Sequence, residues 1–510
     1  MLRARLLKIE QKRARSDPLP QTDAPYTDSF EFKVESSGSK PKARRLDHHF
    51  SLDSTEQVSS PLKDSSRSAR DPSKPPIITL GTARPAPHFF PWTSLSMEGL
   101  PHNHFAKVGA DSAPVSMGSI NGENAYNLSI AMSYGYSAGS PQVLRFATEH
   151  VELVHNPPYD DWECCITCGT TSAMEIAFRV LCNRGDWVLL EGYTYPGTIA
   201  AANAQGLRTM GVEMDNDGLS PQHLRSILEG WNESKGRKPS VLYMIPSGQN
   251  PTGTSQSAAR RKDIYRIAEE HDLYIIEDDP YYFFNLGESL DSEDGPTTPE
   301  VFLSRLPPSY LSLDTSGRVL RMDSVSKILA PGIRCGWVTA SSQVIGKFVS
   351  QTEAGVLSPS GPSQVMVYKL LDETWGHEGL LWWLVHLSAQ YRQRRDILFR
   401  ACQKYLPLEI CQCDLPKMGM FLWIQVSLSA HPLAGDRSAS DIEDSIYNAA
   451  LDNGVLVSKG TWFAQCKNQS GYLQFRLTYA AAEEIDLTKA VERFAVAVRA
   501  EFQLGETPPV

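Results

Sequence analysis

Lys327 lies in a run of small residues and hydroxyls, Asp323-Ser324-Val325-Ser326-Lys327, and Arg334 follows seven residues later. Such surroundings suit a structural loop poorly. They suit a reactive lysine, because desolvation readily lowers the pKa of a lysine and its amine can then condense with an aldehyde. The run therefore predicts a lysine that forms a Schiff base beside an arginine that clamps a phosphate.

Gly169-Thr170-Thr171 opens a helical pattern directly after an apolar run. A glycine turn and hydroxyls at a helix N-terminus offer free N–H groups and the positive end of the helix dipole, which together bind anions. An ordinary helix cap is an equally good interpretation of these residues alone. The chain has no GxxxxGK[ST] motif and no convincing GxGxxG motif, so a nucleotide phosphate is not the favoured anion.

Three more groups of polar or aromatic residues follow apolar runs. Tyr195 stands after the second run, and Asn250 lies within Pro246-Ser-Gly-Gln-Asn-Pro-Thr-Gly253 after the third. The fourth run leads into Asp278-Asp279-Pro280-Tyr281-Tyr282. Adjacent carboxylates are either solvent-exposed turn acids or partners of a cation, and the second interpretation indicates a functional site.

The elements that must position these residues are short, apolar and unalternating runs, which is typical of strands buried on both faces. Helical patterns separate them, as in Ala173, Ile176, Ala177, Val180 and Leu181. This alternation predicts an α/β fold with a mostly parallel sheet sandwiched by helices, in which functional groups gather at the carboxyl ends of the strands. After about residue 365 the pattern changes to a smaller α+β domain. The predicted strands are 163–168, 187–191, 241–245, 273–277 and 319–322, and then 421–426, 455–457 and 472–479.

These motifs, taken in order, resemble the fold-type I, class I and II pyridoxal-phosphate (PLP) aminotransferases. The resemblance rests on Asn250-Pro-Thr-Gly253, Asp279-x-x-Tyr282, Ser324-x-Ser326-Lys327 and Arg334. The chain more closely resembles the branch that contains aromatic-amino-acid, kynurenine and 2-aminoadipate aminotransferases. This closer resemblance rests on Tyr134-Gly-Tyr-Ser-Ala-Gly139, Glu277-Asp-Asp-Pro-Tyr-Tyr282 and Gly419-Met-Phe-Leu-Trp423. The resemblance covers roughly residues 77 to 505 and implies a seven-stranded sheet like that of aspartate aminotransferase.

The resemblance also implies the roles of the catalytic and cofactor-binding residues. Lys327 would form the Schiff base with PLP and later carry a proton between the substrate Cα and the cofactor. Asp279 would pair with the pyridine nitrogen, and Tyr282 with Asn250 would hydrogen-bond the phenolic oxygen. Tyr195 would stack on the ring. The phosphate would be held by Gly169, Thr170, Thr171, Ser324, Ser326 and Arg334.

The same resemblance assigns the substrate side of the site. Arg476, in Gln474-Phe-Arg-Leu477, matches the arginine that binds the substrate α-carboxylate, which a guanidinium fork fits with two parallel bonds. Arg84 lies in the segment that would close over the substrate. Tyr134 matches a tyrosine that reaches the cofactor of the neighbouring subunit, which implies a homodimer with shared active sites.

The implied reaction is transamination between an aromatic L-amino acid and a 2-oxo acid such as 2-oxoglutarate. Carbon–sulfur β-elimination is the main alternative, because it would use the same Lys327 and Asp279. A transcription regulator built on this fold is a further alternative, although the first 75 residues show no three-helix pattern.

Composition and charge narrow the class of protein. The 510 residues carry 49 Lys and Arg against 59 Asp and Glu, a net charge of −10, which argues against a nucleic-acid partner bound through bulk positive charge. The sequence has no run of 18 consecutive apolar residues, so it predicts no membrane-spanning helix. Nine cysteines without a secretory signal favour a reduced, cytoplasmic setting. Cys165-x-x-Cys168 lies inside a predicted buried strand, so we expect no metal site.

The chain is expected to divide into four parts. Residues 1–75 hold 15 Lys and Arg, 11 Asp and Glu and few large apolar residues, so we predict a disordered basic tail. A mitochondrial presequence is the alternative for its first 15 residues, which could form a basic amphipathic helix. An N-terminal arm with part of the small domain follows at 76–125, the large PLP-binding domain at 126–360, and the small C-terminal domain at 361–510.

Overall fold

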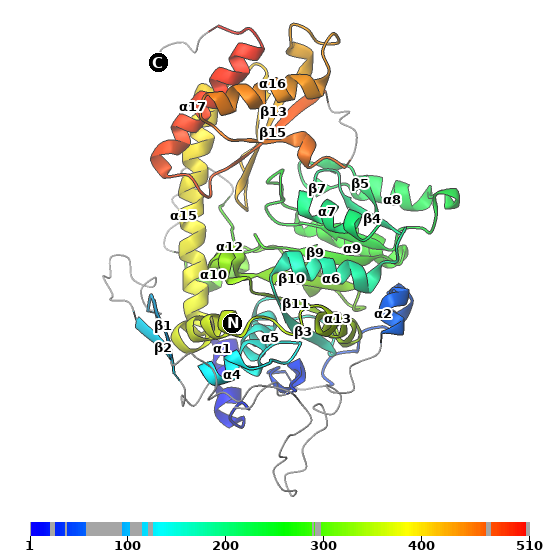
Figure 1. Ribbon diagram of the computed structural model, residues 1–510, viewed down its shortest axis with the longest axis vertical. Helices are drawn as coiled ribbons and strands as arrows, with labels where there is room; N and C mark the ends of the chain where they lie inside the picture. The colour runs from blue at the N-terminus through cyan, green and yellow to red at the C-terminus, as the bar shows by residue number, and fades with distance from the viewer. Residues whose placement is uncertain are drawn as a thin grey trace, which may run out of the picture.

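The structure is a computed structural model that describes residues 2–20, 26–35, 38–57, 94–101, 115–120, 126–287, 290, 297–465 and 471–505. It contains a seven-stranded sheet and, at the other end of the molecule, a four-stranded sheet (Figure 1). The long helix α15 (Gly376–Tyr405) runs between these two parts. Within the described residues, no helix is both long and apolar enough to cross a membrane.

The seven-stranded sheet has the order β3-β11-β10-β9-β8-β4-β5. All its strands pair in parallel except β11, which is antiparallel to both of its neighbours, so the predicted mostly parallel sheet is confirmed. The strands are β3 (Trp162–Thr167), β4 (Trp187–Glu191), β5 (Arg208–Val212), β8 (Val241–Met244), β9 (Tyr274–Asp278), β10 (Val319–Ser324) and β11 (Gly336–Ser341).

Helices lie on both faces of this sheet and bury their apolar sides against it (Figure 1). The helix predicted from Ala173 to Leu181 is α6, and those five apolar residues are buried as expected. The larger helices are α5 (Pro141–Val154), α6 (Thr170–Leu181), α7 (Pro196–Ala204), α8 (Pro221–Glu229), α9 (Ala258–Glu270) and α13 (Ser342–Gly355). Shorter elements are α4 (Leu128–Met132), β6 (Met214–Asp215), β7 (Gly218–Leu219), α10 (Pro299–Ser304), α11 (Tyr310–Leu313) and α12 (Val325–Ile328).

The smaller part is an α+β unit, as predicted. Its sheet has the order β12-β13-β15-β14 and is antiparallel throughout. The predicted strand at 455–457 is wrong, because the strand there is Ser458–Lys459. The elements are β12 (Cys411–Gln412), β13 (Phe421–Ser427), α16 (Ala439–Asp452), β14 (Ser458–Lys459), β15 (Tyr472–Thr478) and α17 (Glu484–Glu501), and α14 (Gly361–Tyr368) leads through a π-helical turn, η6 (Lys369–Trp375), into α15.

The prediction of a disordered tail is wrong for the described residues between 2 and 57. Helix α1 (Leu2–Arg15) buries Leu2 and Ile9, and its Arg13 forms ion pairs with Glu149 and Asp372, whose side chains are 3% exposed. Composition suggested too little apolar surface for folding, yet two apolar anchors and one partly buried arginine hold the helix on α5 and η6. The other elements here are η1 (Ser29–Glu31), η2 (Asp47–His49) and α2 (Leu52–Glu56).

The segment predicted as an N-terminal arm, 76–125, is described only in part. The strands β1 (Ser94–Gly99) and β2 (Val115–Ile120) form an antiparallel pair. Arg84 lies outside the described residues. The boundaries of the four predicted parts stay predictions.

Candidate active site

Lys327 lies in α12, a single helical turn that follows β10 at the carboxyl end of the strand. Its side chain is half-buried, and among the described residues its amine forms no hydrogen bond. Burial lowers the pKa of Lys327, and the nearby Arg476 and Arg334 lower it further, while the carboxylate of Asp278 raises it. The site therefore favours the neutral, nucleophilic amine and places one carboxylate near it.

That carboxylate belongs to Asp278 and not to Asp279, which corrects the prediction. Asp278 is the last residue of β9, and consecutive strand residues point to opposite faces of the sheet. Its Oδ2 accepts a 2.5 Å hydrogen bond from the Tyr243 hydroxyl, and its buried Oδ1 has no hydrogen-bond partner. Burial raises the pKa of Asp278 to about 6, against the attraction of Tyr243 and Arg321, and Lys327 also lowers it.

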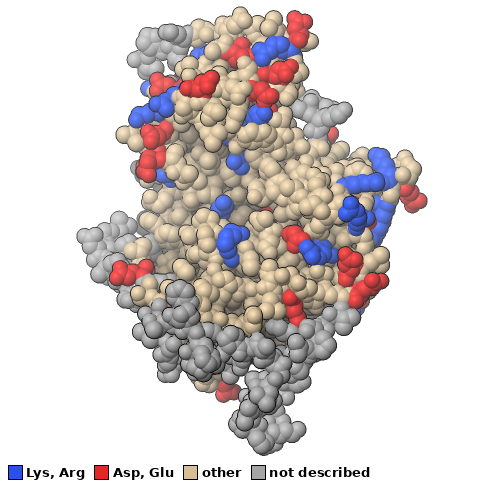
Figure 2. All heavy atoms as spheres, viewed as in Figure 1, with Lys and Arg blue, Asp and Glu red and all other residues tan. Residues whose placement is uncertain are grey.

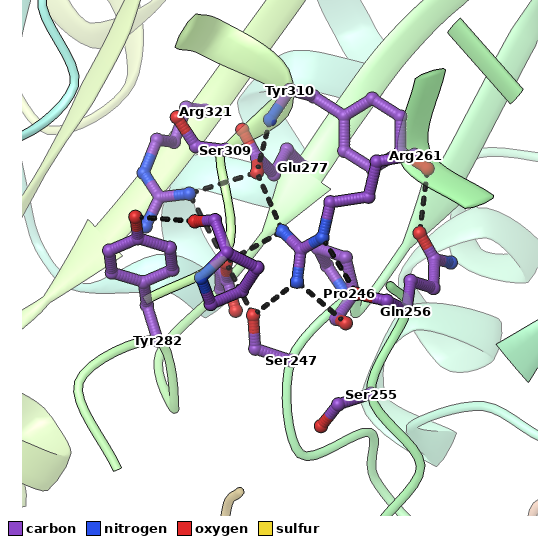
Figure 3. Close-up of polar contacts among 12 residues, drawn as sticks. Pro246, Ser247, Ser255, Gln256, Arg261, Glu277, Tyr282, Ser309, Tyr310 and Arg321 are labelled. Carbon is purple, nitrogen blue, oxygen red and sulfur yellow. Dashed lines mark hydrogen bonds and ion pairs between the residues drawn. The ribbon is translucent and has the colours of Figure 1, made fainter. Parts of the chain in front are cut away.

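Asp279 instead belongs to a buried ionic cluster on the other side of the strand. Its Oδ2 accepts hydrogen bonds from Arg321 Nη1 at 3.2 Å and from Ser247 Oγ at 3.1 Å, and it lies 4.0 Å from Arg261 Nη1. Glu277, two residues earlier on the same face, lies 2.9 Å from Arg321 Nη1 (Figure 3). Asp279 is thus already paired inside the protein.

The role predicted for Tyr282 is corrected in the same way. Its hydroxyl donates to the Pro307 carbonyl at 2.8 Å, and its ring lies 4.6 Å below the Arg321 guanidinium. Figure 3 shows it beside that arginine, as part of the buried cluster. Tyr281 takes the expected place, since its hydroxyl hydrogen-bonds the Asn250 side chain. Burial and the nearby Asp278 raise the pKa of Tyr281, and Arg476 lowers it.

The predicted phosphate residues come together at the N-terminus of α6. Gly169, with φ +88°, leaves room for the guanidinium of Arg334, because a Cβ there would lie 2.5 Å from Arg334 Nη2. Arg334 donates to the Cys168 carbonyl at 3.0 Å and to Ser326 Oγ at 3.4 Å. Ser324 Oγ caps α12 by accepting from the Ser326 N–H at 3.1 Å.

Thr170 and Thr171 complete this cluster. They form the first turn of the twelve-residue α6, and among the described residues their hydroxyls form no hydrogen bond. Exposed hydroxyls, N–H groups of a helix start and a guanidinium now lie at one place, as an oxyanion requires. On the face that Figure 2 shows, basic side chains come to the surface near the region where Figure 1 labels α12.

Arg476 lies on β15 in the smaller part and reaches across to the larger one. Its Nη1 donates to Asn250 Oδ1 at 2.7 Å and its Nη2 to Ser458 Oγ at 3.2 Å, while its Nε is buried without a partner. The rings of Phe421 and Phe463 stand 4.7 and 4.9 Å from the guanidinium. The arginine is thereby fixed in place with its Nε–H unused.

Tyr195 and Tyr134 expose their rings. Tyr195 precedes α7, is 37% exposed, and acts electrostatically on Arg476 and Tyr281. Tyr134 is 57% exposed. These interactions bring Tyr195 to the site, whereas no contact among the described residues brings Tyr134 there.

Three site residues were missed from the sequence: Asp278, Tyr281 and Tyr243. The first two lie one position before the residues chosen, and strand alternation was the available signal, because it separates Asp278 from Glu277 and Asp279. Tyr243 sits inside the apolar strand β8, where no residue type distinguishes it from packing.

Comparisons with known proteins agree with this geometry. The family model described as "Aminotransferase class I and II" matches residues 129–494. The chain belongs to the class I and II aminotransferases. It is 46% identical to aminotransferase swnA of Metarhizium robertsii over 92% of this chain and 95% of that one. It is 37% identical to an aromatic amino acid aminotransferase of Schizosaccharomyces pombe over 90% and 98% of the two chains.

Among solved structures, aminotransferase Aro8 from Candida albicans is similar, with a TM-score of 0.84 and 35% identity over 91% of this chain and all of that one. The aminotransferase family, the branch and the fold predicted from the motifs are confirmed, and the enzyme is a transferase that carries out transamination. Neither elimination nor a regulator role is favoured by these comparisons.

Proposed function

We propose that this aminotransferase transfers the amino group of an aromatic L-amino acid to a 2-oxo acid such as 2-oxoglutarate, with PLP held on Lys327. The observation that carries the proposal is the convergence of Lys327, Asp278, Arg334 and Arg476 at the carboxyl ends of the parallel strands. Arg334, Arg476 and Asp278 come from separate parts of the chain, and each shifts the pKa of the Lys327 amine.

The residues present fit PLP. The start of α6 with Arg334 would take the phosphate, and the unpaired Oδ1 of Asp278 would take the protonated pyridine nitrogen. Tyr281 and Asn250, already hydrogen-bonded to each other, would hold the phenolic oxygen. When bound, PLP supplies an electron sink for the negative charge that develops at the substrate Cα.

The protein's own groups perform the remaining work. Tyr243 holds the Asp278 carboxylate in one orientation through its 2.5 Å hydrogen bond. Lys327 Nζ, whose pKa is lowered by burial and by two arginines, is suited to accept and return a proton. Arg476 orients the substrate through its carboxylate.

The aromatic preference is supported by rings around Arg476 and by the relatives. Tyr193 packs edge-on against Trp423 at 5.3 Å, and Trp423 against Phe463 at 6.3 Å. The Schizosaccharomyces pombe relative is named for aromatic amino acids. Of these rings Tyr193 is only partly buried, so it offers stacking surface to an aromatic donor.

A panel of amino donors assayed with 2-oxoglutarate tests the proposal. We expect phenylalanine, tyrosine or tryptophan to yield glutamate faster than 2-aminoadipate, aspartate or alanine, and Lys327→Ala to lose turnover and the absorbance of bound PLP. Preferred use of 2-aminoadipate would contradict the substrate class. Release of pyruvate and ammonia from a cysteine-like donor, without glutamate, would contradict transamination.

We also infer a homodimer with shared active sites. The support is Tyr134, a large side chain left 57% exposed in the single chain. Light scattering should give twice the 56.6 kDa of one chain. Mixing Lys327→Ala with Tyr134→Ala should restore activity by leaving one intact site per mixed dimer; a monomer, or no recovery on mixing, would contradict the shared site.

We propose that the enzyme works in the cytoplasm. The support is Arg13, because cleavage of α1 as a presequence would leave the buried carboxylates of Glu149 and Asp372 without this partner. Microscopy of a fusion with a C-terminal fluorescent protein tests this, and mitochondrial fluorescence would contradict it.

A further inference from the structure

The short helix that carries Lys327 ends without a donor for its last carbonyl. Helix α12 has four residues, and Leu329 leaves it with φ −123° and ψ −83°. The residue three positions after Ile328 is Pro331, which has no N–H. The Ile328 carbonyl therefore needs a donor from elsewhere in the protein.

Trp383 supplies that donor. Its indole Nε1–H donates to the Ile328 carbonyl oxygen at 2.6 Å. Trp383 lies on α15, which begins at the large sheet and extends to the smaller part (Figure 1). The residue next to the candidate Schiff-base lysine is thus tied to the helix that joins the two parts.

The Trp383 ring is itself held from two sides. Trp375 packs against it with ring centroids 5.8 Å apart, and the Trp375 indole donates to the Leu100 carbonyl at 2.8 Å. His386 stacks on Trp383 at 5.8 Å with the planes 28° apart. A donor fixed in this way defines the direction of the carbonyl that it contacts.

We propose that Trp383 is a positioning residue of the reaction, whose indole N–H fixes the end of α12 and thereby the direction of the Lys327 side chain. This inference rests on the proposed role of Lys327. If Trp383 served only in packing, its ring would matter and its N–H would not. Removing the N–H while keeping the ring therefore distinguishes a positioning residue from a packing residue.

The test replaces Trp383 with Phe in the full-length enzyme, and also with 3-benzothienylalanine, which keeps the two-ring shape but has no N–H. Trp382→Phe is the matched control, because Trp382 neighbours it on α15 and forms no hydrogen bond among the described residues. The readouts are the midpoint pH of the absorbance change of bound PLP, hydrogen exchange at residues 325–330, kcat and KM.

In both Trp383 variants we expect kcat to fall by about tenfold, which corresponds to the loss of one hydrogen bond from the transition state, with KM nearly unchanged. The midpoint pH should move and exchange at 325–330 should rise, whereas Trp382→Phe should change neither. Because the benzothienyl variant preserves shape, it decides the matter if Trp383→Phe fails to fold.

An unchanged midpoint pH and kcat in the benzothienyl variant would overturn the proposal and leave Trp383 a packing residue. Borohydride reduction of the wild-type enzyme keeps this outcome separate from failure of the proposed function. If no PLP becomes attached to Lys327 after reduction, the role of Lys327 itself is wrong.

Discussion

Replacing Asp278 and Asp279 separately with Asn tests which carboxylate serves the cofactor. In Asp278→Asn the side chain keeps its size but loses the charge that acts on Lys327 and would pair with the pyridine nitrogen. Breaking a buried charge pair costs about 3 to 5 kcal/mol. The same loss from the transition state should lower kcat roughly 10² to 10⁴-fold.

Asp279→Asn should leave kcat almost unchanged. Around Arg261 and Arg321 stand the carboxylates of Glu277, Asp279 and Asp323, so two positive charges face three negative ones, and removing one carboxylate leaves them balanced. Arg321 keeps Glu277 at 2.9 Å and Asp323 at 3.0 Å. The expected cost is about 1 to 3 kcal/mol in the free energy of unfolding.

The assay compares kcat with 2-oxoglutarate, the absorbance of bound PLP and urea unfolding for both variants beside the wild type. Loss of cofactor absorbance and turnover in Asp279→Asn, with a nearly normal Asp278→Asn, would refute the assignment. It would mean that the ionic cluster, and not the Tyr243-held carboxylate, faces the cofactor.

Three further predictions concern other parts of the molecule. Arg476→Ala should raise KM for both amino acid and oxo acid about ten- to a hundredfold, since hydrogen bonds to charged groups contribute about 1.5 to 3 kcal/mol, and an unchanged KM would place the carboxylate arginine elsewhere. Arg13→Ala should lower the free energy of unfolding by about 1 to 3 kcal/mol, because Glu149 keeps His377 and Asp372 keeps Arg145. The exposed Lys8→Ala, on the same helix, should not lower it, and equal urea midpoints for Arg13→Ala and the wild type would contradict the anchoring role. Burial raises the pKa of Glu191 to about 8, so this group's stabilisation is complete below about pH 4.5 and is lost as pH rises through about 8. Glu191→Gln should flatten this decline of the unfolding free energy with pH, by at most about 1.4 kcal/mol per pH unit. Parallel plots of unfolding free energy against pH for the variant and the wild type would contradict the role of Glu191.

The large sheet was largely predictable because its strands are buried on both faces. The expected strand 187–191 coincides with β4, and 319–322 falls inside β10. The antiparallel strand β11 was not predicted, since Gly336–Ser341 follows the predicted phosphate loop without a helical crossover.

The acid and the tyrosine proposed to serve the cofactor were predictable to within one residue, and the error has a physical cause. The string Asp278-Asp279-Pro280-Tyr281-Tyr282 fits the spacing Asp-x-x-Tyr in two registers. Only the strand pleat, which puts Glu277 and Asp279 together beside Arg321, selects the first register. Partners such as Arg321 lie far along the chain, so local spacing could not show them.

The N-terminal segment was mispredicted because composition does not reveal distant partners. Ser29 illustrates this: its hydroxyl oxygen accepts the backbone N–H of Cys164 at 2.8 Å, on the edge strand β3. That contact covers a free donor at the sheet edge, a group that a protein otherwise leaves open to pairing with another strand. A serine in a polar tail gives no sign of such a role.

The contact between Arg13 and Asp372 spans 359 residues of sequence, which affects how the protein is made. At roughly 5 to 20 residues per second, a ribosome takes about 20 to 70 s to synthesise the chain between the two. During that interval the basic helix α1, with Leu2 and Ile9, has left the ribosome but lacks part of its docking surface. A chaperone or another factor that binds nascent chains therefore has long access to helix α1. Contacts with Glu149 and Leu153 on α5 can form first, and the contact with Asp372 is a late step of folding.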